Sequence, residues 1–545
     1  MTKRTGYPSV DKIHLAGIPD EKLHPNIQPY SMYAIFSQIN EGRMDEVVLE
    51  QNGKTWTKRE IRNDATMFAD ALLNAGVMPH DTIAIALPNS YEGIIITLGA
   101  NAIGVKVAYL NPELSKDEQL QLVNERDYKM LFGGGDMDFY YKFIKRNEEA
   151  FHKNDRCTVK PYPQTLDMIQ QYSVSEEVAI YLQTSGSTSG VPKILPFTNR
   201  AIFASLMYIA NSTGTKTNDE SVNSVLCIIP YRLPYGWMTI FINLIAGNKV
   251  ILAPGATPHD IGEYYKLKPS YIYGTPVIFR TFMEETPEDA DLSSITAFFC
   301  SGFAIPEEWY QEGRKYFAKH GNMKAEIRNN YGIGEGLCIG TASDGIEHKP
   351  GTCGKFYVGP EWKIVDDDYF EVKYDEVGEL IVAAESLCEG YLGDEEATEV
   401  AFVDIAGKIY YSTGDYVKLS EDGYVTFVGR KKRFYQPKGA TDKVNCETIE
   451  QAILKSHRAK RCAVVIYEGE DGFETSCAFV ELKHPKDSHE GWLDYKRMYE
   501  QLLDGGGLLP YQMPSKIIAI DEIPMMKSGK PDYANLRKIL NEMLS

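Results

Sequence analysis

The sequence lacks the paired cysteines and histidines that mark disulfide scaffolds and tightly bound transition metals. Its nine cysteines are scattered from position 157 to position 477, and no two of them form a CxxC pair. None of the ten histidines stands in an HExxH motif. These absences argue against a disulfide framework and a zinc-type site, so we expect reduced and mostly structural thiols.

Positive charge is also scarce. The chain has 57 lysines and arginines against 76 aspartates and glutamates, a net charge of −19, and its pI is about 5.1. An acidic surface disfavours unspecific binding to DNA, RNA or anionic lipid, so no nucleic-acid partner is predicted. A polyanionic ligand therefore needs a local site that is organised in advance.

Long apolar runs are absent as well. The longest, over residues 93–110, is interrupted by Asn101, Lys106 and three glycines. This composition is typical of a buried helix followed by a buried strand, and no membrane span is predicted. The basic residues near the N-terminus have no apolar stretch behind them, which disfavours a secretory signal and predicts a cytoplasmic location.

What is present is the composition and patterning of a large α/β protein. Hydrophobic residues make up 43% and charged residues 24% of 545 positions, which suits a globular chain of several domain-sized units. Residues 81–110 predict a strand, a helix and a second strand, which is a β-α-β crossover in a parallel sheet. Similar alternation recurs over 221–254, with a helix expected at 238–247, and again around 270–302.

The pattern changes after about residue 350. Short strands with turn residues between them predict a β-rich subdomain over 350–430, and a final α/β segment has helical patterns at 446–457 and 533–544. The basic run 430–433 is more typical of a solvated linker than of a nucleic-acid contact. We therefore predict an N-terminal domain over 1–430 and a small, mobile α+β C-terminal domain over 431–545.

The first chemical motif is the segment "YLQTSGSTSGVPK" at 181–193, which follows an apolar strand. Small residues let backbone N–H groups approach a ligand closely, hydroxyls add donors, and Lys193 adds a positive charge. This combination suits phosphate oxygens, although such a segment taken alone is also compatible with a simple flexible turn. The Walker A pattern is not present.

Four further motifs follow in order: "NNYGIGEGL" at 329–337, "YYSTGDYVKL" at 410–419, "GRKKRF" at 429–434 and "IPMMKSGKPDYANL" at 523–536. Together with 181–193, their order and spacing resemble the adenylate-forming superfamily of acyl-CoA synthetases, luciferases and nonribosomal-peptide adenylation domains. The resemblance extends from about residue 30 to the C-terminus.

The resemblance implies a ligase that uses ATP and Mg²⁺ to convert a carboxylic acid to an acyl-AMP with release of pyrophosphate. The thiol of coenzyme A then displaces AMP. Transfer to a carrier-protein phosphopantetheine is an open alternative, and a nucleotide-binding sensor without turnover is an alternative of another class. The acid, the acceptor, the oligomeric state and the pathway are left open.

The resemblance also assigns roles to residues. Lys530 is the main catalytic candidate, and Glu335 is expected to hold Mg²⁺. Tyr331 is expected to lie against adenine, Asp415 to accept from the ribose hydroxyls, and Arg430 to reach the ribose or a phosphate. The remaining nucleotide-site candidates are Thr184, Ser185, Gly186, Ser187, Thr188, Ser189, Gly190, Lys193, Gly302, Phe303, Ala304, Asn330, Gly332 and Gly334.

Three further sets complete the expected site. Lys432 is the expected hinge between the domains, and Lys438 and Gly439 are expected on the side where the thiol enters. Gly236 matches the position of the aspartate that pairs with the substrate α-amino group in relatives that activate amino acids, so an aryl or aliphatic acid is favoured over an α-amino acid. The candidates for the acyl pocket, each equally compatible with ordinary core, are Tyr235, Gly236, Trp237, Met238, Ile333 and Leu337.

The sequence departs from the family pattern at several positions. The phosphate-loop segment has one residue more than the usual form, and Gly334 replaces a common threonine. Phe303 replaces a common glycine, Leu233 a common histidine, and Gln436 a lysine that some relatives use in thioester formation. These changes affect the expected AMP contacts. The sequence therefore supports the thioester step less strongly than the adenylation step.

Overall fold

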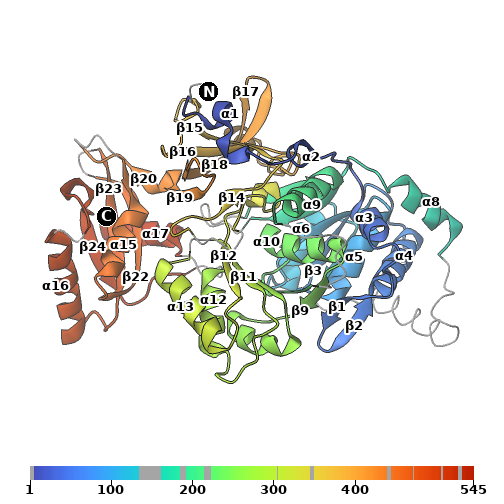
Figure 1. Cartoon of the computed structure of the whole chain (residues 1–545), viewed down its shortest axis with the longest axis horizontal. Helices are drawn as coiled ribbons and strands as arrows, with labels where there is room; N and C mark the ends of the chain where they lie inside the picture. Colours follow the sequence, from blue (N-terminus) through green and yellow to red (C-terminus); the bar gives the residue numbers. More distant parts are fainter. Residues whose placement is uncertain are drawn as a thin grey trace.

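The computed structural model places a large N-terminal part beside a smaller C-terminal part, drawn in orange and red at the left of Figure 1. The N-terminal part contains two large sheets with helices around them and a separate β-rich subdomain. The residues that the structure describes are 5–133, 161–184, 192–213, 223–302, 305–343, 349–438, 443–469, 472–504, 507–525 and 531–544.

The first sheet has five strands in the order β5-β3-β4-β6-β7. Their bounds are β3 (Thr82–Ala86), β4 (Lys106–Tyr109), β5 (Met130–Gly133), β6 (Val178–Gln183) and β7 (Ile194–Thr198). β3 pairs in parallel with β4, and helix α5 (Tyr91–Ala102) connects them, so the crossover predicted over 81–110 is confirmed. β6 and β7 pair antiparallel, which places Gln183 opposite Ile194 at the two ends of the phosphate-loop segment.

The second sheet has seven strands in the order β12-β11-β10-β8-β9-β1-β2. Their bounds are β1 (Val47–Gln51), β2 (Lys54–Thr57), β8 (Ser224–Cys227), β9 (Lys249–Leu252), β10 (Tyr271–Gly274), β11 (Ala297–Cys300) and β12 (Glu326–Asn329). All neighbours pair in parallel except β1 and β2. The βα alternation predicted over 221–254 and around 270–302 is confirmed.

Helices cover these sheets. Their bounds are α3 (Met32–Ile39), α4 (Lys58–Asn74), α6 (Lys116–Glu125), α8 (Pro163–Gln171), α9 (Asn199–Thr213), α12 (Pro276–Glu285), α13 (Glu307–Lys319) and the 3₁₀ helix η3 (Pro258–Leu267). Local chemistry sets where some of them begin. For example, Thr57 and Glu60 form a capping box at the start of α4, so two backbone N–H groups without helical partners are satisfied.

The helix predicted over 238–247 exists but is not a regular α-helix. It starts as α10 (Pro234–Trp237), widens into the π-helical turn η2 (Met238–Ile242) and ends as α11 (Asn243–Ala246). The Thr239 hydroxyl donates to the carbonyl of Tyr235 at 2.8 Å, and the Asn243 amide donates to the carbonyl of Thr239 at 2.7 Å. These side chains supply hydrogen bonds to the backbone where the regular ladder changes.

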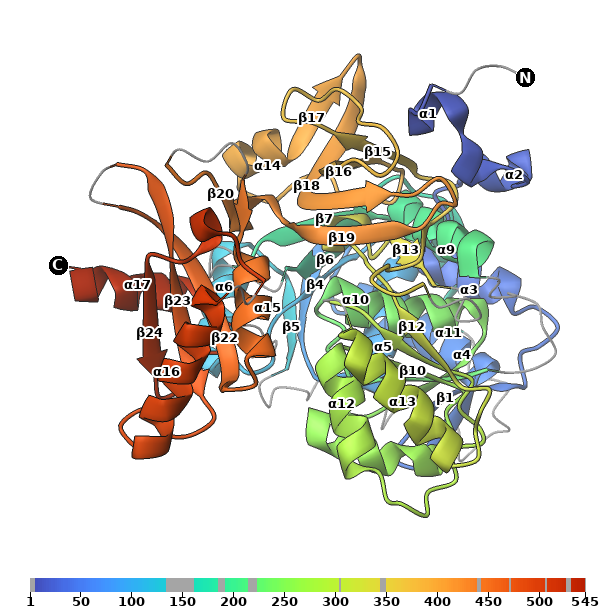
Figure 2. The same cartoon turned by 60° about the vertical axis from the view of Figure 1, so that its left-hand side comes forward.

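The β-rich subdomain predicted after residue 350 is also present. Its main sheet contains β15 (Glu361–Val365), β16 (Gly378–Ala383), β17 (Phe402–Ile405), β18 (Lys408–Leu419) and β19 (Val425–Arg430). β13 (Thr341–Ala342) and β14 (Lys355–Phe356) form a separate two-stranded pair, and helix α14 (Glu395–Ala401) packs against β17 and β18. The N-terminal helices α1 (Pro8–Asp11), η1 (Ile13–Leu15) and α2 (Asp20–Leu23) begin the chain near this subdomain (Figure 2). The backbone N–H of Ser9 donates to Glu371 at 3.0 Å.

The C-terminal part has its own apolar interior. Its elements are β20 (Phe434–Tyr435), β21 (Val444–Asn445), α15 (Cys446–Lys455), β22 (Ala459–Glu468), β23 (Glu474–Leu482), α16 (His489–Leu503), η6 (Pro510–Gln512), β24 (Lys516–Ile520) and α17 (Tyr533–Leu544). Val464 and Ala463 belong to different apolar clusters, because successive side chains of β22 point to opposite faces of the sheet. Both clusters contain only residues between 435 and 540.

The junction between the two parts is the short 3₁₀ helix η5 (Lys431–Arg433). The Lys431 ammonium contacts Glu379 of β16 at 2.7 Å, whereas the Arg433 guanidinium pairs with Glu450 of α15. Lys432 is exposed between these two anchored neighbours. This arrangement suits a hinge at Lys432, and the domain boundary stays a prediction.

The apolar run 93–110 forms buried parts of α5 and β4, as expected from its interrupted pattern. None of the helices among the described residues is long and apolar enough to cross a membrane.

Candidate active site

The two described ends of the phosphate-loop segment are held together. The backbone N–H of Thr184 donates to the carbonyl of Lys193 at 2.9 Å, and the N–H of Lys193 donates to the Thr184 hydroxyl at 2.9 Å. Thr184 and Lys193 lie next to the last residue pair of the β6–β7 ladder, Gln183 and Ile194. The structure therefore fixes the base of this loop at the edge strand of the first sheet.

Glu335 lies in the short 3₁₀ helix η4 (Gly334–Gly336), which follows β12. Its backbone carbonyl accepts a hydrogen bond from the N–H of Cys388 at 2.7 Å. Its carboxylate Oε1 accepts one from the hydroxyl of Tyr391 at 2.9 Å, and the Lys193 ammonium lies 3.9 Å above the centroid of the same tyrosine ring. Lys193 and Glu335, far apart in the chain, thus meet around one aromatic side chain.

Asp415 forms a second polar cluster with Tyr331 and Arg430. Its carboxylate is 1% exposed, and it accepts from the Tyr331 hydroxyl at 2.6 Å and pairs with the Arg430 guanidinium at 2.8 Å. Burial, followed by the charge of Asp415, raises the pKa of Tyr331 well above its ordinary value, so this phenol stays a neutral donor. The structure therefore brings together three of the residues expected at the nucleoside.

Three further nucleotide-site candidates are described, of which Asn330 and Gly332 flank Tyr331 in the chain. Asn330 follows β12, and its side-chain carbonyl accepts from the N–H of Ser343 at 3.1 Å. Gly332 forms an isolated bridge with Gly340. Gly302 has a φ of +102°, a conformation that favours glycine.

The candidates for the acyl pocket lie on α10 and around η4, and these two elements adjoin. A Cβ built at Gly334 would lie 3.5 Å from Cγ of Pro234. Tyr235 is partly buried, and its hydroxyl donates to the carbonyl of Gly274 at 3.3 Å. Burial raises the pKa of Tyr235 well above its ordinary value, so its hydroxyl is neutral.

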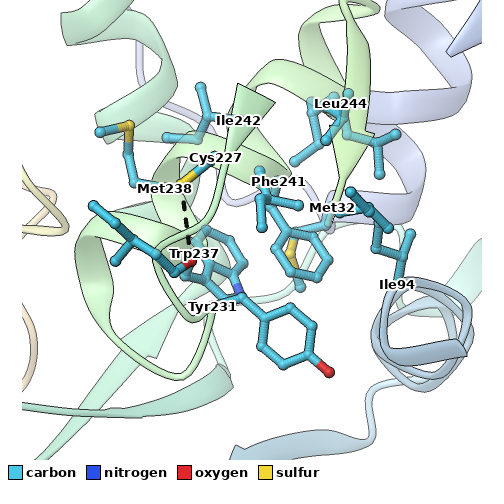
Figure 3. Packing of buried hydrophobic residues seen from close by; sticks show 14 of the residues in the cluster. Met32, Ile94, Cys227, Tyr231, Trp237, Met238, Phe241, Ile242 and Leu244 are labelled. Atoms are coloured by element: carbon cyan, nitrogen blue, oxygen red, sulfur yellow. Dashed lines mark hydrogen bonds between the residues drawn. The ribbon is translucent and has the colours of Figure 1, made fainter. Parts of the chain in front are cut away.

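Trp237 is fully buried in the largest apolar cluster, together with Met238 and Leu337. Its indole stacks on Phe241 with ring centroids 4.7 Å apart (Figure 3). The indole N–H donates to the Tyr109 hydroxyl at 3.1 Å. Ile333 belongs to a different cluster, with Tyr357 and Ile339. These contacts favour a packing role for Trp237, while the assignment of the other side chains to an acyl pocket stays a prediction.

Gly236 has no room for a side chain. A Cβ at this position would lie 2.3 Å from the carbonyl oxygen of Pro230 and 2.4 Å from that of Ile229. An aspartate at position 236 would therefore force the preceding backbone to move. The close approach of two backbone segments explains this glycine, and it means that position 236 contributes no side chain to an acyl pocket.

Of the candidates in the C-terminal part, Lys438 is among the described residues. Lys438 is exposed, with its ammonium 5.1 Å from the centroid of the Phe473 ring. Met525 and Pro531 form an isolated bridge on either side of the segment that contains Lys530. The candidates that lie outside the described residues are Ser185, Gly186, Ser187, Thr188, Ser189, Gly190, Phe303, Ala304, Gly439 and Lys530.

The described residues suit Mg²⁺ carried by a nucleotide better than a metal held by protein alone. Nowhere in the described ranges do three or more histidine, cysteine, aspartate or glutamate side chains gather in a way that could hold a metal. Mg²⁺ commonly keeps several waters and takes one or two carboxylates besides substrate phosphates. The single carboxylate of Glu335, beside the base of the phosphate-loop segment, fits this donor set.

Comparison with known proteins decides the family. The family described as AMP-binding enzyme matches residues 36–392. The chain belongs to this family. The resemblance to the adenylate-forming superfamily and the α/β fold class that it implied are confirmed.

Individual relatives are distant. The chain is 23% identical to 4-coumarate–CoA ligase 2 of Nicotiana tabacum, over 97% of each chain. It is 24% identical to bacitracin synthase 1 of Bacillus licheniformis over 92% of its own length, but it spans only 9% of that synthase. The crystal structure of the anthranilate CoA ligase AuaEII in complex with anthranoyl-AMP superposes with a TM-score of 0.74, at 19% identity, over 95% of this chain and 98% of that chain. At this identity the structural likeness shows the fold alone.

Sequence reasoning did not select Tyr391. This residue lies in the segment "GELIVAAESLCEGYLGDEEAT", which resembles the family only weakly, and no pattern within it indicates a contact with Glu335 or Lys193. Only the residue type could have suggested this role, because a phenol offers an apolar face and one polar end.

The close packing at Gly236 generates a prediction about stability. We expect Gly236→Ala to lower the free energy of unfolding by about 1–3 kcal/mol, because the added methyl group would overlap a backbone carbonyl. Gly334→Ala is the matched control, since a Cβ there meets its nearest atom at 3.5 Å. Its effect should stay within about 0.5 kcal/mol. Urea unfolding of both variants measures the difference, and equal midpoints would contradict the packing argument.

Proposed function

We propose that this protein activates a carboxylic acid with ATP, forming an acyl-AMP and pyrophosphate, and then transfers the acyl group to the thiol of coenzyme A. The observation that carries the proposal is the meeting of Lys193 and Glu335 around Tyr391, within a chain that belongs to the AMP-binding enzymes. A cation and a hard-oxygen ligand that contact the same tyrosine suit a polyphosphate that arrives with Mg²⁺.

The phosphates are assigned to the segment 184–193. Thr184 and Lys193 hold the base of this segment, and Lys193 provides one charge for the β- and γ-phosphates. Glu335 is the proposed Mg²⁺ ligand. When bound, Mg²⁺ would neutralise part of the phosphate charge.

The nucleoside is assigned to the cluster around Asp415. A carboxylate has about four lone-pair sites, so Asp415 can accept from ribose hydroxyls in addition to Tyr331 and Arg430. Tyr331 offers an apolar ring for the adenine, with Phe427 behind it at a centroid distance of 6.1 Å. Arg430 is half-exposed and is proposed to reach the ribose or the α-phosphate.

Lys530 is proposed to act on the transition state. Attack of a carboxylate on the α-phosphate brings two anions together, and a lysine between them stabilises the charge that builds up there. Lys530 has to approach for this step and then withdraw, so that a thiol can enter near Lys438 and Gly439. Rotation of the C-terminal part about Lys432 would accomplish both movements.

The proposed substrate class is an aryl or aliphatic carboxylic acid. Gly236 leaves no space for the aspartate that would pair with an α-amino group. The apolar residues Met238, Ile333 and Leu337 near η4 suit an apolar acyl group. AuaEII was crystallised with the aryl adenylate anthranoyl-AMP, so this fold can hold an aryl adenylate.

Exchange of labelled pyrophosphate into ATP tests the adenylation step. With a panel of acids, we expect exchange with at least one aryl or aliphatic acid and none with α-amino acids, because Gly236 offers no counter-charge. Tight ATP binding without exchange for any acid would contradict the enzyme and support the nucleotide sensor. Exchange with amino acids alone would contradict the substrate class.

The same preparation separates the two acceptors. Product on coenzyme A supports the proposed ligase, and product found only on a carrier protein supports the alternative. The alternative stays open because a region of bacitracin synthase 1 is as similar to this chain as the coumarate ligase is.

Lys530→Ala tests the catalytic assignment. We expect pyrophosphate exchange to fall about 10²-fold or more, as is common when one organised transition-state contact is lost, with little change in ATP affinity. Lys527→Ala, three residues earlier in the same segment, is the matched control and should keep its exchange rate. An equal loss in both variants would mean that the segment as a whole, rather than Lys530, is responsible.

Asp415→Asn tests the ribose assignment. The amide keeps the size of the side chain but removes the charge, so we expect ATP and AMP affinity to fall by about 1 kcal/mol or more, since hydrogen bonds to a charged group are the stronger ones. Asp422→Asn is the control, because Asp422 pairs with Lys349 at 2.7 Å on an exposed turn. Calorimetric titration with both nucleotides measures the change, and an unaltered affinity in Asp415→Asn would remove it from the ribose role.

A further inference from the structure

Tyr391 lies on a segment that joins the two halves of the proposed phosphate site. On one side, the N–H groups of Glu389 and Leu392 donate to the carbonyls of Pro196 and Ile194 in β7, at 3.2 Å and 3.0 Å. On the other side, the N–H of Cys388 donates to the carbonyl of Glu335 at 2.7 Å. The backbone of residues 388–392 is therefore bonded to both η4 and the strand that begins next to Lys193.

The position of Tyr391 on this segment is fixed by further contacts. Its N–H donates to the Thr398 hydroxyl at 2.9 Å, and Phe402 meets its ring edge-on with a centroid distance of 6.2 Å. The preceding Gly390 has a φ of +102°, and a Cβ there would lie 2.6 Å from Cγ2 of Thr398. The tyrosine is 8% exposed, so its side chain is held in place by packing.

The two ends of this side chain act on opposite charges. The hydroxyl donates to Oε1 of Glu335 at 2.9 Å, and the ring face lies 3.9 Å below the Lys193 ammonium. Burial, followed by the charge of Glu335, raises the pKa of Tyr391 far above its ordinary value. Tyr411 is the neighbouring titratable group, and its pKa is also raised, first by burial and then by the charge of Glu335. Glu335 is thus flanked by phenols that remain neutral donors.

We propose that Tyr391 is a positioning residue that holds the Glu335 carboxylate in one orientation for Mg²⁺ and holds the Lys193 ammonium at the base of the phosphate-loop segment. The inference rests on the proposed function, because it needs a polyphosphate with its cation in this place. A hydrogen-bonded partner that orients a metal ligand commonly affects metal affinity strongly when it is removed. The aromatic face contributes separately, through attraction of the lysine ammonium to the ring.

Two substitutions separate the two contributions. Tyr391→Phe removes only the hydroxyl and keeps the ring under Lys193, whereas Tyr391→Leu removes both. Tyr410→Phe is a matched control, because Tyr410 is also buried, donates its hydroxyl to Glu361 and has the Lys363 ammonium 4.8 Å from its ring centroid. The control therefore loses the same type of hydrogen bond in the β-rich subdomain.

Calorimetric titration of each full-length variant with ATP, in the presence of Mg²⁺ and in the presence of a chelator, measures the effect without turnover. In Tyr391→Phe, we expect the factor by which Mg²⁺ strengthens ATP binding to fall about 10-fold or more, with little change in the affinity for metal-free ATP. In Tyr391→Leu, the affinity for metal-free ATP should fall as well, by about 2- to 5-fold. Tyr410→Phe should match the wild type in both titrations.

The outcomes distinguish the inference from the function. If the wild type binds ATP more tightly with Mg²⁺ and Tyr391→Phe retains the same factor, the positioning role is wrong while the proposed function stands. A loss in Tyr391→Phe that is equal with and without Mg²⁺, or equal to that in Tyr410→Phe, overturns it too. If the wild type does not bind ATP, both fail. Tyr391→Phe decides the question even if Tyr391→Leu fails to fold, because it preserves the packing of the ring.

Discussion

The lysine and the carboxylate that are proposed to face a polyphosphate attract each other. If they formed a direct ion pair, each group would be less available to the ligand. In this protein the side chain of Tyr391 lies between them, with its ring under the Lys193 ammonium and its hydroxyl on Glu335. The phenol satisfies each group with a different part of its surface. β7 and η4 keep this tyrosine in place, because both are hydrogen-bonded to the backbone of its segment.

The cluster proposed for the nucleoside depends on charge burial in a similar way. Asp415 is buried, so its negative charge requires the partners that Arg430 and Tyr331 provide. The charges of this cluster also affect the carboxyl of Glu447, in the first turn of α15. Burial, together with Glu450, raises the pKa of Glu447 to about 7, and the charges of Asp415 and Arg430 act on it as well.

Local patterns predicted the fold well where an element is buried on all sides or has a clear period. The segment 81–110 forms β3, α5 and β4 as expected, because continuous apolar residues on both sides of a helical stretch fit only a buried crossover. The helix over 238–247 was predicted, but its π-helical turn was not, since it depends on side-chain bonds from Thr239 and Asn243 to the backbone. The sequence leaves Trp237 open as a pocket or a core residue, and its stacking on Phe241 favours the core.

By itself, the sequence determined the α/β class, the order of the family motifs and the residue types that phosphate, metal and ribose require. These features depend on side-chain chemistry and on neighbours in the chain, so they can be inferred from the sequence alone. Only the tertiary structure decided that the carbonyls of residues 229–230 leave no space for a side chain at Gly236, and that Tyr391 connects Lys193 with Glu335. Both depend on segments distant in the chain that pack within a few ångströms, and no periodicity or spacing along one segment encodes that distance.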